Sequence, residues 1–257
     1  MLDRLSAILT DVGATLIELR TRGPIKGTWA DSTQFKAEAD RIAHERLVRA
    51  LGALTPAVPV VSEEDAVHER DRPPEYWLID PIDGTASYAG GFDGFVTQAA
   101  LMNRGAPILA VVHAPALGLT YYAERDRGAH LNGTRLDVTS GDPTRAVLID
   151  NYPEPRATAL AAFQELSMTG YVESGSIALK ICRIADGTAD LFFKDVNLRD
   201  WDVAPAELIL LEAGGVMTGI DGAPFLYDGD WVKPGVIAAR SEALLEHFKA
   251  WHTARLA

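Results

Sequence analysis

The chain carries, at residues 77–85, the run Trp77-Leu78-Ile79-Asp80-Pro81-Ile82-Asp83-Gly84-Thr85. Its apolar beginning predicts a buried strand that ends at Asp80. Because Pro81 fixes its own φ and keeps the preceding residue extended, the carboxylates of Asp80 and Asp83 can face one point. Gly84 lets the backbone approach a ligand closely, and Thr85 can cap a following helix whose free N–H groups would face an anion. The run therefore favours a site for Mg²⁺ and phosphate together, although Asp-Pro-x-Asp-Gly is also a common surface turn.

Two other acidic segments follow the ends of predicted elements. The acids Glu63, Glu64 and Asp65 come directly after a β-branched run that predicts a strand at 58–62. They form either a solvated loop or a cation site, since a cation would remove their mutual repulsion. Asp202, which follows Trp201, stands where a helix N-cap is expected. A capping role and a metal role are compatible there, because a helix start also attracts anions.

Length and periodicity predict one unit built of two sub-regions. The chain has 257 residues, of which 47% are hydrophobic, so a sizeable core is possible. Residues 1–142 predict an α+β sub-region with helices at 2–19 and 36–51, an exposed loop at 25–35 and a largely antiparallel sheet. Residues 143–257 alternate strands and helices and predict an α/β sub-region. The first would supply most metal ligands, and the second would supply Asp202 and substrate contacts.

Composition narrows the range of partners. The formal net charge is −12, which repels a polyanion such as nucleic acid. Cys182 is the only cysteine, so a disulfide framework and a cysteine-rich zinc site are excluded, and a small buried helix residue is expected instead. No segment approaches the ~20 apolar residues of a membrane span. We therefore expect a cytoplasmic protein that binds neither nucleic acid nor membrane.

The three acidic segments, in this order, resemble the inositol monophosphatase superfamily of Mg²⁺-dependent, lithium-sensitive phosphatases. The matching segments are Glu63-Glu64, Asp80-Pro81-Ile82-Asp83-Gly84-Thr85, Trp201-Asp202-Val203-Ala204 and Glu212-Ala213-Gly214-Gly215. The resemblance covers nearly the whole chain. It implies a layered αβαβα sandwich, a homodimer, and hydrolysis of a small phosphate ester by metal-activated water.

The resemblance further implies a centre of two or three Mg²⁺ ions. Glu63, Asp80 and the carbonyl of Ile82 would bind one ion. Asp80, Asp83 and Asp202 would bind a second, and a third, weaker ion would lie near Glu63.

Other roles surround these metals in the family. The backbone N–H groups of Gly84 and Thr85 would hold the phosphate. Asp40 would work with the Thr85 hydroxyl to orient and deprotonate the attacking water, and Glu63 belongs to the same catalytic group. Asp195 falls where inositol phosphatases place a substrate-binding Glu, from which it differs by one methylene.

A predicted helix at 176–185 bears on the substrate. Ser176 lies in the segment Gly175-Ser176-Ile177-Ala178-Leu179, which also resembles the family, and it is a candidate substrate-binding residue. With Lys180, the segment Ser176–Cys182 resembles the bisphosphate nucleotidase branch of the superfamily. Lys180 either faces solvent or faces the cleft, where it could meet a second phosphate. Asp195 favours an inositol-1-phosphate-like substrate, which is the main prediction, whereas Lys180 favours the alternative, adenosine 3′,5′-bisphosphate. Histidinol phosphate and fructose 1,6-bisphosphate are further options.

A protein of a different class is a further alternative. Lys36 and Ala37 stand where the family often has Val-Thr before the residue that matches Asp40. A catalytically silent protein that binds metal and phosphate would tolerate this change.

Overall fold

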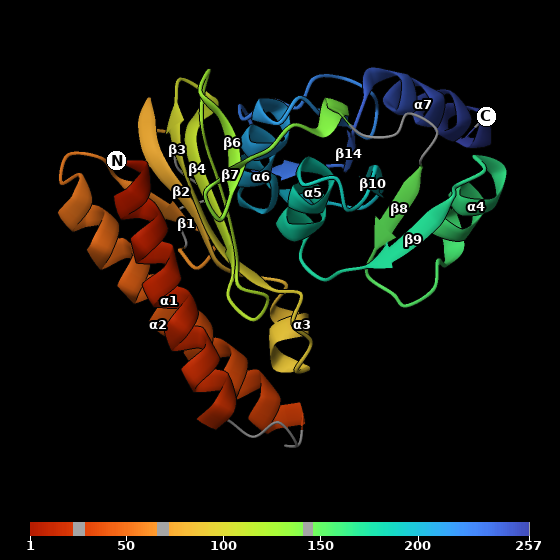
Figure 1. Cartoon of the computed structure of the whole chain (residues 1–257). Coiled ribbons are helices and arrows are strands. Elements are labelled where there is room, and N and C mark those ends of the chain that lie inside the picture. Colours follow the sequence, from red (N-terminus) through yellow and green to blue (C-terminus); the bar gives the residue numbers. More distant parts are fainter. Residues whose placement is uncertain (23–28, 66–71, 141–145, 257) are drawn as a thin grey trace.

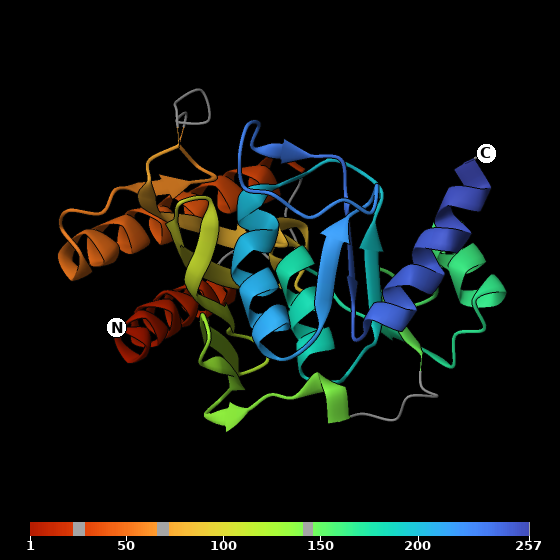
Figure 2. The same ribbon diagram turned by 90° about the horizontal axis from the view of Figure 1, so that it is seen from above.

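Helices and sheets alternate in five layers within the described part of the chain, residues 1–22, 29–65, 72–140 and 146–256 of this computed structural model (Figure 1). The outer helices α1 (Leu2–Arg22) and α2 (Trp29–Leu54) cover a first sheet. The central helices α5 (Ile177–Ala185) and α6 (Asp200–Glu212) separate it from a second sheet, which α4 (Ala157–Glu165) and α7 (Glu242–Leu256) cover (Figure 2). The predicted αβαβα sandwich is confirmed, while the predicted boundary at residue 142 lies outside the described residues.

The first sheet holds strands β1 to β7 in chain order. Their bounds are β1 (Val60–Ser62), β2 (Glu75–Asp83), β3 (Val96–Asn103), β4 (Ala106–Ala114), β5 (Leu119–Glu124), β6 (Gly128–Leu131) and β7 (Thr134–Arg135). Strand β1 pairs parallel with β2, and the later pairs are antiparallel. The β6–β7 turn contains Asn132 and Gly133, both with positive φ, as an Asn-Gly hairpin requires.

Strand β2 is buried on both faces, which explains its unbroken apolar run. Trp77 and Ile79 pack in the cluster below α1 and α2, whereas Tyr76 and Leu78 pack in the cluster that contains α5 and α6. Successive side chains of a strand alternate between faces, so Asp80 continues the row that faces α5 and α6. The strand does not end at Asp80 as predicted. It continues to Asp83 across an irregularity in its pairing with β3, because Pro81 cannot join the ladder but keeps the chain extended.

Helix α2 begins at Trp29, so the predicted exposed loop at 25–35 is wrong from residue 29 onward. Residues 25–28 lie outside the described part, as do the side chains of Lys36 and Ala37. The polar composition of this stretch does not specify its backbone conformation. Because no Gly or Pro occurs between residues 29 and 51, nothing in the sequence breaks the helix there.

The second sheet has the order β12-β14-β10-β8-β9. Its strands are β8 (Val147–Asp150), β9 (Gly170–Glu173), β10 (Leu191–Lys194), β12 (Val216–Gly219) and β14 (Val236–Ala239), and a separate short pair joins β11 (Leu198–Arg199) to β13 (Val232–Lys233). Strand β8 runs parallel to β9 and β10, and β14 is antiparallel to its neighbours. Sequence periodicity misses β9, β11, β12 and β13, because short, partly exposed strands carry little apolar pattern.

Helix α6 lies at the centre of the molecule and buries the carboxyl group of Glu207. Burial raises the pKa of Glu207 to about 7, although Tyr227 and Arg125 oppose the shift. The native protein therefore holds a proton that an unfolded chain releases near pH 4.3. This contribution to stability is complete below that pH and is lost as the pH rises through about 7.

Glu207→Gln removes this titration, so its stability relative to wild type should rise by about 2–3 kcal/mol between pH 5 and pH 8. Urea unfolding of both proteins at the two pH values measures the change. The exposed Glu242→Gln serves as the control. A difference between Glu207→Gln and wild type that does not vary with pH would contradict the buried titration.

Candidate active site

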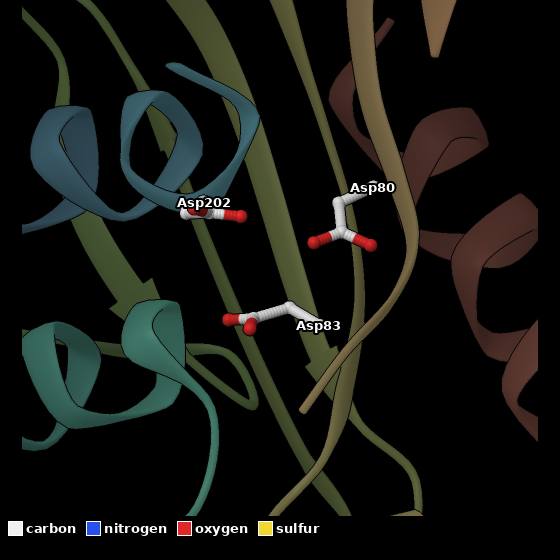
Figure 3. Close-up of side chains that lie close together, drawn as sticks. All are labelled: Asp80, Asp83 and Asp202. Atoms are coloured by element: carbon white, nitrogen blue, oxygen red, sulfur yellow. The ribbon is translucent and has the colours of Figure 1, made fainter. Parts of the chain in front are cut away.

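Three carboxyl groups from distant parts of the chain meet between the first sheet and the central helices. Asp80 and Asp83 come from the carboxyl end of β2, and Asp202 comes from the first turn of α6. Each offers an oxygen that lies within 4.8 Å of the others. Figure 3 shows the three side chains converging on one space. Because period-two alternation turns Asp80 toward α6, the fold itself brings this cluster together.

The cluster is electrostatically strained without a cation. Burial raises the pKa of Asp80 well above its ordinary value, and the charges of Glu63, Asp83 and Asp202 add to this effect. Burial, followed by the charge of Asp83, raises the pKa of Asp202 to about 8. Buried carboxylates that repel one another are stabilised by a bound cation. The all-oxygen donor set fits a hard ion such as Mg²⁺.

Asp83 is oriented by the start of α5. Its Oδ2 accepts hydrogen bonds from the hydroxyl of Ser176 and, at 2.9 Å, from the N–H of Ala178. The Ser176 hydroxyl in turn accepts a hydrogen bond from the N–H of Leu179 at 2.9 Å and caps the helix. Burial raises the pKa of Asp83, and these donors lower it. Ser176 thus contacts a member of the acidic cluster directly.

Asp202 is not a helix N-cap as predicted. It is the third residue of α6, whose N-cap is Arg199, and its carboxylate accepts a hydrogen bond from the Arg199 N–H at 2.7 Å. The helix begins at Asp200, directly after Arg199, which ends β11 in an extended conformation. One Asp202 oxygen thus stabilises the helix start while the side chain reaches the acidic cluster.

The turn after Asp83 holds the chain in a tight path. Gly84 has φ +85 and is the N-cap of the short helix α3 (Thr85–Ala89), so Thr85 is its first residue and not its cap as predicted. The Thr85 hydroxyl donates to the Ile82 carbonyl at 3.2 Å, and the Ile82 N–H donates to Asp80 Oδ1 at 3.0 Å. This turn therefore fixes Asp80 relative to the residues that follow Asp83.

Asp40 and Glu63 lie near the centre, Asp40 on α2 and Glu63 directly after β1. The parallel β1–β2 pairing lets the Glu63 N–H donate to the Ile79 carbonyl at 3.2 Å. Its side chain shares a hydrogen bond with Asp80. Asp40 is buried on α2. Burial raises the pKa of Tyr88 in α3, and the charge of Asp40 adds to this effect. Asp40 therefore lies near the helix that begins with Thr85.

A pocket of about 530 Å³ adjoins the acidic cluster. Its lining residues are Asp83, Gly84, Ala86, Ser87, Phe92, Asn151, Tyr152, Glu173, Gly175, Ser176, Ile177, Lys180 and Lys194. Lys180 is 1% exposed, so of the two orientations left open by the sequence, the one toward the cleft is correct. Asp195 is exposed, accepts a hydrogen bond from the Thr158 hydroxyl at 3.2 Å, and is not among the lining residues.

Lys180 is held by polar contacts that compensate its burial. Its Nζ donates to the side-chain oxygen of Asn151 and, at 3.4 Å, to the Gly175 carbonyl. Burial lowers the pKa of Lys180 to about 8, against the opposing charges of Asp83 and Asp150. The side chain can therefore carry a positive charge at neutral pH.

Sequence reasoning missed the pocket residues Asn151 and Lys194. Asn151 directly follows β8, and Lys194 ends β10. These strands are parallel, so their carboxyl ends meet at one edge of the sheet. A signal was available, because ligands bind beyond the carboxyl ends of parallel strands, but the sequence gives no motif at either position.

The fold and the acidic centre together define a layered protein of helices and sheets with a carboxylate cluster that could hold a metal ion and an adjoining polar pocket. Residues 6–253 match the model of the inositol monophosphatase family. The chain therefore belongs to this family of phosphatases, whose members generally depend on Mg²⁺.

Relatives and solved structures support this assignment. The chain is 29% identical to the putative Nus factor SuhB of Neisseria meningitidis serogroup B, over 90% of each protein. It is 32% identical to the 3′(2′),5′-bisphosphate nucleotidase CysQ of Aggregatibacter actinomycetemcomitans, over 74% of each. The Thermotoga maritima IMPase matches with a TM-score of 0.79 at 26% identity, covering 100% of this chain and 99% of that one. Within the described residues, no helix is long and apolar enough to span a membrane.

Close backbone contact between the two halves yields a test of the site. A Cβ placed on Gly175 would overlap the Gly94 carbonyl and the Ser87 hydroxyl. Gly175→Ala should therefore displace the neighbouring Ser176 from Asp83 and lower both activity and stability, the latter by about 1–3 kcal/mol.

Phosphatase assays and thermal unfolding measure these two effects. Gly52→Ala is the matched control, since a Cβ there meets nothing within 4 Å inside α2; a stability equal to or above wild type is expected. Equal behaviour of the two variants would contradict the close contact at Gly175.

Proposed function

We propose that this protein is a Mg²⁺-dependent phosphomonoesterase whose substrate is a small phosphate ester with a second anionic group, of the nucleoside 3′,5′-bisphosphate class. The observation that carries this proposal is the pocket, which Asp83 of the acidic cluster lines together with Lys180 and Lys194. A divalent ion at the cluster would attract the ester phosphate, and the two ammonium groups would attract a second anion. The CysQ relative, a bisphosphate nucleotidase by name, supports the same class of substrate.

An inositol-1-phosphate-like polyol phosphate is the second candidate. Glu173 lines the same pocket, and its carboxylate can accept hydrogen bonds from hydroxyl groups. Asp195, which motivated this candidate in the sequence, contacts Thr158 on the outside of the pocket lining. The two lysines of the lining support the bisphosphate, because a second anionic group needs cations beside the metal site and a polyol phosphate does not.

The proposed metal ligands are Asp80, Asp83 and Asp202, with Glu63 and the Ile82 carbonyl beside them. Two or three ions per site is the number that the family resemblance implies. The chemistry that Mg²⁺ supplies when bound is charge neutralisation, activation of water and stabilisation of the leaving oxygen.

The remaining roles belong to groups of the chain itself. The N–H groups of Gly84 and Thr85 would bind phosphate oxygens, supported by the left-handed Gly84 that lines the pocket. Asp40 would accept the proton of the attacking water, with the Thr85 hydroxyl orienting it. The burial of Asp40 and its position near α3 support this assignment. A homodimer and a cytoplasmic location stay predictions.

Asp83→Asn tests the metal centre. The amide oxygen can still accept hydrogen bonds from Ser176 and Ala178, so the fold should persist while one metal charge is lost. We expect at least about a 100-fold loss of phosphate release, since changes behind the ligands alone cost 10–100-fold. Without Mg²⁺ the variant should be more stable than wild type, because one source of repulsion is gone.

Assays of p-nitrophenyl phosphate hydrolysis over a Mg²⁺ series, together with thermal unfolding, give both readouts. The exposed Asp3→Asn is the control and should match wild type. If Asp83→Asn turned over substrate near the wild-type rate, Asp83 would not be a metal ligand. If the wild-type protein showed no Mg²⁺-dependent turnover, the catalytically silent alternative would be favoured.

Lys180→Met tests the second anion, because Met keeps the length of the side chain and removes its charge. The variant should lose about 10-fold or more in kcat/KM for adenosine 3′,5′-bisphosphate, the size of one charged hydrogen bond, and less for inositol-1-phosphate. Kinetics with both substrates measures the contrast. Lys249→Met, on the outer helix α7, is the control. Equal losses of kcat/KM for both substrates would show that Lys180 does not determine substrate specificity.

A further inference from the structure

Gln98 is a buried polar residue that neither the metal cluster nor the pocket includes. Its side chain is 0% exposed. In the β2–β3 ladder it is the direct partner of Asp80, and cross-strand partners project to the same face of a sheet. Gln98 therefore stands beside Asp80 on the face that meets α5 and α6.

One hydrogen bond joins Gln98 to the metal-bearing helix. Its Nε2 donates to the main-chain carbonyl of Trp201 at 2.9 Å, and Trp201 immediately precedes Asp202. The bond therefore links the strand position opposite Asp80 to the residue next to Asp202. The bond thus helps to set the distance between the carboxylates of Asp80 and Asp202, which must stay close in order to share an ion.

The first turn of α6 is also held from another direction. Arg72 Nη2 lies 2.6 Å from Asp200 Oδ2, and the Asp200 N–H donates to the Trp231 carbonyl at 3.1 Å. Arg72 stands before the beginning of β2, at the end opposite Asp80 and Asp83. These contacts fix the helix start at one end of the strand, and Gln98 fixes it at the level of the carboxylates.

The amide at position 98 is only partly satisfied, since its nitrogen bonds the Trp201 carbonyl and its oxygen bonds nothing in the described residues. Within the described residues, Oε1 of Gln98 has no hydrogen-bond partner although it is buried. Buried amide oxygens without a partner are unfavourable and rare in native proteins. An apolar side chain would avoid this penalty, but it would take a donor away from the buried Trp201 carbonyl, because Pro205, four residues later in α6, has no N–H to supply the helical bond. The Gln98 amide thus takes the place of a helical hydrogen bond in the first turn of α6.

We propose that Gln98 is a positioning residue of the metal centre, which holds the first turn of α6 so that Asp202 stays in register with Asp80 and Asp83. This inference rests on the proposed function, because it requires that the cluster bind a divalent ion. Groups that orient metal ligands without touching the ion contribute 10–100-fold to affinity in other metal sites.

Gln98→Leu removes the donor at similar volume, and Gln98→Asn keeps an amide that is one methylene too short to reach the Trp201 carbonyl. Thr97→Val is the matched control. Thr97 is buried on the same strand with its side chain on the opposite face, and within the described residues its hydroxyl has no hydrogen-bond partner.

The dissociation constant for Mg²⁺, measured by titration calorimetry on the metal-free protein, should rise about 10-fold in Gln98→Leu. Gln98→Asn should shift it in the same direction, and Thr97→Val should stay within about twofold of wild type. In kinetics, the Mg²⁺ concentration for half-maximal rate should rise more than kcat falls at saturating Mg²⁺. A role in packing alone would lower stability without this split.

The inference is overturned if both folded Gln98 variants bind Mg²⁺ with wild-type affinity, or if their loss of Mg²⁺ affinity equals that of Thr97→Val. If Gln98→Leu does not fold, the result for Gln98→Asn decides. A wild-type protein that binds Mg²⁺ while the variants match it defeats only the role of Gln98. A wild-type protein that binds no Mg²⁺ overturns the proposed function and this inference with it.

Discussion

Mutual repulsion among buried carboxylates is the constraint that the rest of the structure must withstand. Asp80, Asp83 and Asp202 offer oxygens within 4.8 Å of one another, and burial makes each charge harder to bear. Separate parts of the fold hold them there. Asp80 is fixed by a strand buried on both faces, Asp83 by the hydroxyl of Ser176, and Asp202 by a central helix. Packing energy spread over three layers thus maintains a local arrangement that is unfavourable by itself.

The sequence predicts this centre well because its elements are local and strongly patterned. An apolar strand followed by Asp-Pro-Ile-Asp-Gly-Thr fixes the direction of two carboxylates with no reference to the rest of the chain. The alternation of faces along β2 then assigns Asp80 to the inner side. The ends of elements were harder to predict. The sequence predicts Asp202 as an N-cap and Thr85 as a cap, yet Arg199 and Gly84 take those positions. A cap depends on φ and on hydrogen bonds made after packing, and residue type alone leaves both open by a residue or more.

The pocket could not be predicted to the same degree, because its residues come from both sheets and from α3 and α5, which only the complete fold brings together. Asn151 and Lys194 become neighbours through the parallel pairing of β8 and β10, and no periodicity in the chain specifies that pairing. Lys180 illustrates the same limit. Its helical position is visible in the sequence, but whether it faces solvent or the cleft depends on which side of α5 meets the first sheet. The spacing between Asp195 and Asp202 matches Asp195 to the substrate-binding Glu of inositol phosphatases. Spacing along the chain does not determine where a side chain points, and Asp195 lies outside the pocket lining.

The pocket also explains how a chain with a net charge of −12 can accommodate an anionic substrate. Total charge governs the field at long range, and salt screens that field within about 10 Å. Inside the pocket the nearest charges decide, and there Lys180 is buried, where screening is weak. Its charge is kept by Asp83 and Asp150, so the same carboxylate that belongs to the acidic cluster also stabilises the lysine in the pocket.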